Sequence, residues 1–206
     1  MLSGAGLYVK HNCYNPGSSG PIAQNSELHD GDIIFQVSQS AQCKAIQSAT
    51  KSKYSHCGII YMKDGKCYVY EAVQPVKVTS LDKWIARGMN GHYVVKRLKN
   101  AENILTPATL AKMKSVADQF YGKNYDLTFE WSDDKIYCSE LVWKIYKRGA
   151  GIEIGELQQL KDFDLTQDIV RQKVQERYGN NIPYEETVIS PAKIFDCELL
   201  ETVRNN

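Results

Sequence analysis

Apolar positions along the chain alternate or recur at helical spacing from about residue 28 onward, and they predict a mixture of short strands and short helices. The runs 33–37 and 92–98 are typical of strands. Capping residues and apolar spacing predict helices over the following ranges: from Ser38 or Ser40 to about 50, 81–87, 107–122, 138–149, about 166–178, and a short one from Ser190-Pro191. No internal repeat is evident.

The clearest local signal is a β-hairpin over residues 55–73. Two runs rich in Ile, Val and Tyr flank Asp64-Gly65, a dipeptide that supplies the positive φ angles of a two-residue type I′ turn. With these two residues as the loop, Gly58 lies opposite Glu71 and His56 begins the first strand. Side chains alternate between faces, so His56 and Glu71 project from the same face as diagonal neighbours. The hairpin therefore predicts a carboxylate within reach of an imidazole.

The two cysteines of this hairpin are placed differently. Cys57 follows His56 directly and points to the opposite face, whereas Cys67 lies on the face of His56 but about 20 Å along the partner strand. The register thus suggests neither as a partner for a reactive thiol. A zinc site built from His56 with Cys57 or Cys67 is disfavoured by the same geometry, and no metal or other cofactor is expected.

Composition narrows the possible partners. The 206 residues carry 25 Lys and Arg against 24 Asp and Glu, which gives no bulk charge for nucleic acid. No stretch has the length of a signal peptide's apolar core or of a transmembrane segment. The sequence as given predicts a cytoplasmic protein, or a periplasmic one if a leader is missing. Six cysteines without CxxC spacing, in a chain of this length, predict free thiols rather than a disulfide framework.

Residues 1–27 form an expected flexible arm, since turn formers such as Asn15-Pro16-Gly17 interrupt any period. His11 and Cys13 within it are too few to close a metal site. Residues 28–206 are expected to form a single domain.

Cys138 is the best-placed candidate nucleophile. It opens the helix 138–149, with Leu141, Val142 and Ile145 on the same inward face. The positive end of the helix dipole lowers a thiol pKa by at most about 1.5 units, so a cationic neighbour is needed for full ionisation. His56 can supply that charge and Glu71 can orient the imidazole. On residue types alone, Cys138 as a small buried apolar side chain remains an alternative.

Two further residues near these segments have polar groups of interest. Tyr125 could donate a hydrogen bond toward an oxyanion, although a tyrosine in such a loop usually serves packing. Asp32, which follows Gly31, is expected to be a turn residue rather than a ligand.

The chain resembles the YiiX/YebB-like branch of the NlpC-type, permuted papain-fold cysteine hydrolases over about residues 28–200. The motifs that carry the resemblance are Gly31-Asp32-Ile33-Ile34-Phe35-Gln36, Lys44-Ala45-Ile46-Gln47, Tyr54-Ser55-His56, Glu71-Ala72-Val73, Trp131-Ser132-Asp133-Asp134, Tyr137-Cys138-Ser139-Glu140 and Glu185-Glu186-Thr187-Val188. The order His56, Glu71, Cys138 is that of a circularly permuted papain fold.

The resemblance implies an α+β fold, in which an antiparallel sheet or partial barrel packs against the helix carrying the nucleophile. It implies Cys138 as nucleophile, His56 as base, Glu71 as orienting residue and Tyr125 as a neighbour of the thiol. The expected activity is hydrolysis of an amide, peptide or related acyl bond through a thioester, on a peptide, acyl-amine or other small substrate. Acyl transfer, and a non-catalytic binding module that retains the fold, are the alternatives. The family leader has no counterpart in the polar, Gly-rich start of this chain.

Overall fold

The computed structural model describes residues 27–206. The expected arm at 1–27 therefore lies almost wholly outside the described residues. The strands are β1 (Ile33–Ser38), β2 (His56–Lys63), β3 (Lys66–Glu71), β4 (Lys77–Ser80), β5 (Gly88–Leu98), β6 (Asn124–Tyr125), β7 (Lys135–Ile136), β8 (Gln158–Gln159), β9 (Thr187–Val188) and β10 (Leu200–Asn205). The helices are α1 (Ala41–Thr50), α2 (Leu81–Ala86), α3 (Ala101–Ile104), α4 (Pro107–Phe120), α5 (Cys138–Ile145), α6 (Asp168–Tyr178) and α7 (Pro191–Phe195), with a π-helical turn at Tyr146–Ala150 and a 3₁₀ turn at Leu160–Asp162.

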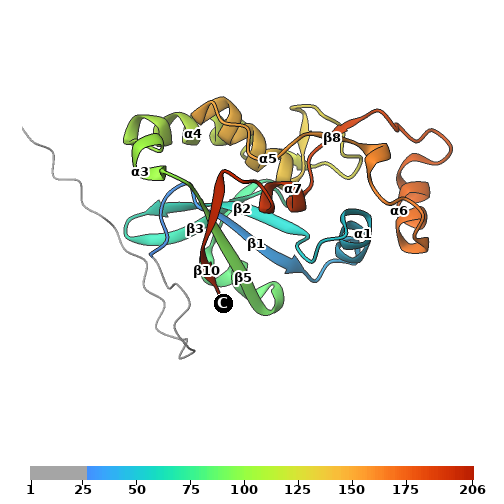
Figure 1. Cartoon of the computed structure of the whole chain (residues 1–206), viewed down its shortest axis with the longest axis horizontal. Helices are drawn as coiled ribbons and strands as arrows, with labels where there is room; N and C mark the ends of the chain where they lie inside the picture. Colours follow the sequence, from blue (N-terminus) through green and yellow to red (C-terminus); the bar gives the residue numbers. More distant parts are fainter. Residues whose placement is uncertain (1–26) are drawn as a thin grey trace, which may run out of the picture.

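A six-stranded sheet with the order β10-β5-β1-β2-β3-β4 forms the centre of the molecule (Figure 1). Each pair of neighbouring strands is antiparallel. The α+β class and the antiparallel sheet are thus confirmed, and the sheet is open rather than a barrel. The two edge strands, β4 and β10, were not predicted, because neither shows a clear alternation of apolar and polar positions.

The hairpin β2-β3 has the predicted register. Lys63 pairs with Lys66 and Ile60 with Val69, so that Asp64-Gly65 is the two-residue loop. Both loop residues have positive φ angles, 50° and 73°, as a type I′ turn requires. The local dipeptide therefore fixes which residues of the two strands face each other.

The sheet buries apolar side chains on both faces. One face carries Phe35, Cys57 and Ile59, which pack in one core cluster with residues of α4 and α5. The other face carries Ile34, Ile60 and Val69, which pack with Leu81 and Trp84 of α2. Figure 1 shows α4 and α5 lying across the sheet, with α1 and α6 together at one end. Successive residues of β2 thus enter two different cores.

Helix α5 ends differently from the prediction. Gly149 was expected to terminate it, but the chain continues through the π-helical turn and ends at Gly151, which has φ 75°. Gly149 instead lies against α4, where a β-carbon would come within 2.6 Å of the Met113 backbone. Its lack of a side chain permits the close approach of the two helices. The predicted starts of α4 and α7 are confirmed by the caps that Thr106 and Ser190 provide.

Candidate active site

His56 and Glu71 meet as the hairpin register predicted. The Nε2 atom of His56 lies 2.7 Å from Oε2 of Glu71, and both residues are buried. Gly58 sits between them on the strand pair, and its missing side chain matters, because a β-carbon there would lie 2.8 Å from the Tyr70 carbonyl oxygen. A residue with a side chain at this position would also crowd the line between the imidazole and the carboxylate.

Two residues that sequence reasoning missed complete the surroundings of Glu71. The hydroxyl of Thr79, on β4, donates a 2.6 Å hydrogen bond to Oε1, and Arg87, just after α2, forms an ion pair with the same oxygen. Burial alone would raise the pKa of Glu71, but the bonds from His56 and Thr79 and the charge of Arg87 lower it. Glu71 is therefore held as a carboxylate although its side chain is completely inaccessible to solvent.

His56 connects the carboxylate to the thiol of Cys138. Because Glu71 occupies Nε2, Nδ1 is the ring nitrogen left to face Cys138. Burial alone would lower the pKa of His56, but its hydrogen bonds with Cys138 and Glu71 outweigh that effect and raise the pKa to about 9. The ring of Trp84 stacks beside the imidazole at 6.0 Å between centroids. The surroundings thus favour an imidazolium in a fixed orientation.

Cys138 is the first residue of α5, as predicted, and it is almost completely buried. Its pKa lies well below the usual value, because the Cys57 side chain, His56 and the backbone N–H of Cys57 stabilise the thiolate against the opposing effect of burial. The arrangement favours a thiolate beside an imidazolium.

The contact with Cys57 corrects the earlier interpretation of that residue. Cys57 does point away from the face of Glu71, but the opposite face is the one against which α5 packs, and this brings the Cys57 side chain to Cys138. Burial, followed by the interaction with Cys138, raises the pKa of Cys57. The free thiols in the described region are those of Cys43, Cys57, Cys138 and Cys197.

Cys67 behaves differently from those four residues. It is disulfide-bonded, with a partner outside the described residues, so the expectation of free thiols is wrong at this position. It lies opposite Met62 near the turn of the hairpin, at the other end from His56.

Tyr125 lies beside Cys138, in β6, and both residues line one pocket. Burial, together with the negative charge of Cys138, raises the pKa of Tyr125, and the Gln42 side chain donates a hydrogen bond to its hydroxyl oxygen. The neutral hydroxyl is therefore the form present near the thiol. Asp32, by contrast, serves the turn before β1: it accepts a bond from the His29 backbone and pairs with Arg97 at 2.7 Å.

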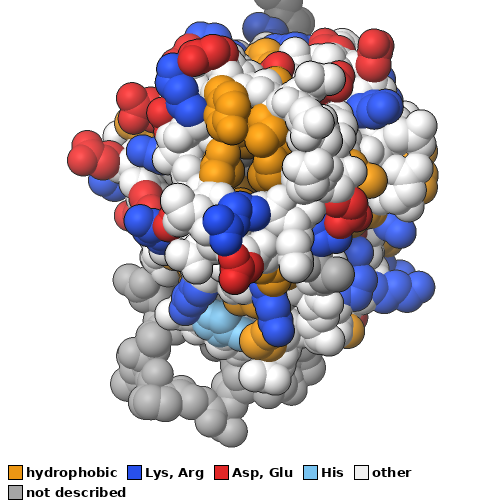
Figure 2. Space-filling model, turned by 90° about the vertical axis from the view of Figure 1, so that its right-hand side faces the viewer, with side chains coloured by type: hydrophobic (Ala, Val, Ile, Leu, Met, Phe, Trp, Pro, Cys, Tyr) orange, Lys and Arg blue, Asp and Glu red, His pale blue; other side chains and the backbone are white. Residues whose placement is uncertain are grey.

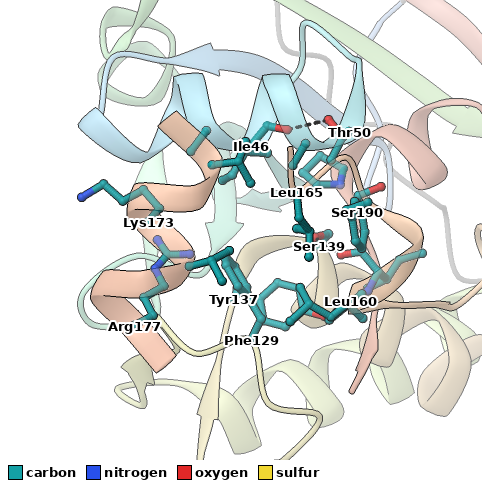
Figure 3. Close-up of a pocket in the computed structure, with 18 of the residues that line it drawn as sticks. Ile46, Thr50, Phe129, Tyr137, Ser139, Leu160, Leu165, Lys173, Arg177 and Ser190 are labelled. Carbon is teal, nitrogen blue, oxygen red and sulfur yellow. Dashed lines mark hydrogen bonds between the residues drawn. The ribbon is translucent and has the colours of Figure 1, made fainter. Parts of the chain in front are cut away.

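The pocket is open to solvent, holds about 730 Å³ and has largely apolar walls. Figure 2 shows the hollow and its hydrophobic side chains on the face of the molecule that carries α1 and α6. Figure 3 shows Ile46 and Thr50 of α1 on one wall and Lys173 and Arg177 of α6 on another. The guanidinium of Arg177 stacks on the ring of Phe129 at 4.8 Å. Cys138 thus faces an apolar cavity with two cationic side chains among its lining.

A polar anchor on α5 supports the loop next to the pocket. Lys144 is buried, and its Nζ atom donates to the Ser132 carbonyl and to Asp133 Oδ1, at 2.5 and 2.8 Å. Arg148, from the following turn, holds the same Asp133 carboxylate with two hydrogen bonds. These contacts give a physical reason for the Trp131-Ser132-Asp133-Asp134 motif, because they fasten its loop to the helix of Cys138.

The whole chain is similar to proteins of one family. Residues 27–204 match the model of the family described as "Permuted papain-like amidase enzyme, YaeF/YiiX, C92 family". The chain belongs to this C92 family. It is 51% identical to the uncharacterized protein YiiX of Escherichia coli K12 over 173 residues, which cover 84% of each chain. The fold of the C92 family and the recognition of a YiiX-like chain are therefore shown.

A crystal structure of this family matches as well. It is described as that of metalloprotein YiiX from Escherichia coli O157:H7, and it has a TM-score of 0.81 and 51% identity, covering 86% of this chain and 97% of the other. The described part of the present C92 chain contains no group of three or more His, Cys, Asp or Glu residues that could hold a metal ion. The donor set therefore does not fit a metal centre in residues 27–206. No helix in that range has the length and apolarity needed to cross a membrane.

Proposed function

We propose that this C92-family protein is a cysteine hydrolase that cleaves an amide, peptide or related acyl bond through a Cys138-His56-Glu71 site. The observation that carries the proposal is the position of His56, which interacts with Cys138 on one side and is bonded to Glu71 on the other. This is the arrangement that activates a thiol and supplies a proton to a leaving group.

The chemistry follows from the order of these contacts. The Cys138 thiolate attacks the substrate carbonyl, and the backbone N–H at the start of α5 helps to stabilise the oxyanion. The His56 imidazolium then protonates the leaving amine, which leaves a thioester on Cys138. A water molecule gives a proton to the neutral imidazole, attacks the thioester and releases the acid. Glu71 keeps the ring in place throughout and stabilises its charged form.

The walls of the pocket support an apolar acyl or amine portion in the substrate. Its lining includes Ala45, Ile46, Val174 and Ile189, and burial of each methylene group of a ligand contributes about 0.8 kcal/mol. Tyr125 is placed to contact the substrate near the thiol. Substrates with an apolar group next to the scissile bond are therefore the first to test.

The test compares wild type with Cys138→Ser and Cys138→Ala, using Cys197→Ser as the matched thiol control. We expect iodoacetamide to label Cys138 of the wild type fastest at pH 6, and both Cys138 variants to lose hydrolysis of N-acyl amides of graded chain length by at least ~10³-fold. Cys197→Ser should keep the wild-type rate. Fastest labelling at Cys57 or Cys43, or hydrolysis that survives in Cys138→Ala, would contradict the proposal.

A further inference from the structure

Cys57 is a buried thiol that the proposed reaction does not use. Its side chain is fully inaccessible to solvent and lies in the core beside Phe35, its partner on β1, yet it touches the reactive atom of the site. Cys43, the other buried thiol of this region, is bonded to the Ser55 hydroxyl at 2.8 Å. Two of the four free thiols of the described region therefore lie side by side, and one of them is the candidate nucleophile.

The two thiols differ in access and in protonation. Cys138 lines the open pocket, whereas Cys57 does not. The surroundings favour a thiolate at Cys138 and a neutral thiol at Cys57. A small oxidant that enters the pocket meets the more reactive sulfur first, because thiolates rather than thiols react with peroxides. The second sulfur is then already within the core behind the first.

The placement also suits a covalent bond between the two residues. Cys57 lies on β2 and Cys138 on the first turn of α5, two elements that pack against each other, and the Cys57 backbone N–H approaches the Cys138 sulfur. This contact sets the main chain of one residue against the side chain of the other, as the short separation of disulfide-linked residues requires.

We propose that Cys57 and Cys138 form an oxidisable dithiol, in which Cys57 is the resolving cysteine for oxidation of Cys138 by a peroxide. In the first step the Cys138 thiolate attacks hydrogen peroxide, the O–O bond breaks, and a proton is taken up to give Cys138 sulfenic acid and water. In the second step Cys57 attacks the sulfenic sulfur, the S–O bond breaks, and the Cys57 proton leaves with the hydroxyl group as water. The sum is two thiols and one peroxide converted into one disulfide and two water molecules.

This disulfide would switch the enzyme off reversibly and protect its nucleophile. A sulfenic acid without a nearby thiol is oxidised further to sulfinic and sulfonic acids, which ordinary thiol reductants do not restore. The inference requires a reactive Cys138 thiolate but not turnover of any particular substrate. Its outcome can therefore be read without a hydrolase assay.

The experiment treats wild type, Cys57→Ser, Cys57→Ala and the control Cys43→Ser with hydrogen peroxide and then with a phosphine reductant. Thermal unfolding first selects the Cys57 variants that remain folded, and Ser, as the conservative replacement, leaves a hydrogen-bonding group next to Cys138. Intact mass, a non-reducing peptide digest and iodoacetamide labelling of Cys138 are measured before and after reduction.

In wild type and Cys43→Ser we expect the loss of two hydrogen atoms, a peptide pair linked through Cys57 and Cys138, and full recovery of labelling after reduction. In the Cys57 variants we expect added oxygen atoms on Cys138 and at least ~10-fold less recovery. If the linked pair is absent and wild type gains oxygen to the same extent as Cys57→Ser, the dithiol proposal is wrong. That result would leave the hydrolase proposal intact, whereas an unreactive Cys138 in untreated wild type would contradict both.

Discussion

Glu71 and Glu140 are both completely buried near the ends of one site, but they are held in opposite protonation states. Glu71 has a lowered pKa, because hydrogen bonds from His56 and Thr79 and the charge of Arg87 outweigh its burial. Burial raises the pKa of Glu140 to about 8, against the opposing effect of Lys144 at 2.7 Å. Equal burial thus gives one permanent charge and one group that is largely neutral at neutral pH.

The difference arises from the number and kind of donors that the fold provides. Glu71 ends β3, where the neighbouring strand, the hairpin partner and the segment after α2 all supply donors. Glu140 lies in the first turn of α5, where Lys144 is also held by the loop at 132–133. A buried carboxylate that must stay charged needs several donors, while one that anchors a helix tolerates a proton.

Glu71→Gln should give the largest effect. The substitution keeps the shape of the side chain but removes the charge that stabilises the His56 imidazolium, so the pKa of His56 should fall from about 9 toward its usual value. We expect kcat to drop by between about 10²- and 10⁴-fold, as for other oriented acid–base groups. The measurement is the pH profile of kcat together with that of Cys138 alkylation.

The matched control is Glu140→Gln, an identical chemical change at a second fully buried carboxylate. Because Glu140 bonds to neither His56 nor Cys138 among the contacts described, its variant should keep kcat within about threefold of wild type. An equal loss of activity in the two variants would show that burial of a carboxylate, rather than its contact with His56, controls the site.

Thr79→Val tests the donors around Glu71 one at a time. Valine replaces the hydroxyl by a methyl group, and a hydrogen bond to a charged group contributes about 1.5 to 3 kcal/mol. We expect the free energy of unfolding to fall by that amount, with a smaller loss of kcat than in Glu71→Gln. Urea denaturation measures the change, and Thr202→Val, on the exposed side of β10, should stay within about 0.5 kcal/mol of wild type. A neutral Thr79→Val would mean that Arg87 and His56 suffice to hold the charge.

Sequence reasoning predicted the parts of this site that local patterns determine. The Asp64-Gly65 turn fixes the register that joins His56 to Glu71, and apolar spacing after Cys138 fixes the helix that it opens. Both features depend on residues a few positions apart in the chain. The catalytic roles of these residues remain predictions that the experiments above address.

The missed features depend on how distant elements pack. Thr79 and Arg87 reach Glu71 only because β4 adds to the sheet beside β3 and is followed directly by α2. Cys57 was placed correctly on its strand, but nothing in the hairpin indicates which face α5 covers. Tertiary packing of helices on a sheet with two apolar faces decides both outcomes.

The smallest expected effect concerns stability between pH 6.5 and 8. Glu140 has a raised pKa, so the folded state keeps a proton that the unfolded state has lost above about 4.5, and its contribution to stability falls as the pH rises toward 8. His56 and Cys138 must be counted together. Above about 6.5 the folded pair holds its one proton on His56, and the unfolded chain holds one on Cys138, up to about 9. The pair therefore adds no slope in this window.

Glu140→Gln should remove the slope that remains. A single proton bound only in the folded state changes stability by at most about 1.4 kcal/mol per pH unit, so wild type should lose about 1 to 2 kcal/mol between pH 6.5 and 8. The variant should lose almost none, since glutamine does not titrate and Lys144 keeps its bond to Asp133. Denaturant titrations at three pH values in this window measure the difference. Parallel slopes in the two proteins would mean that Glu140 is already ionised at pH 6.5, which would remove its contrast with Glu71.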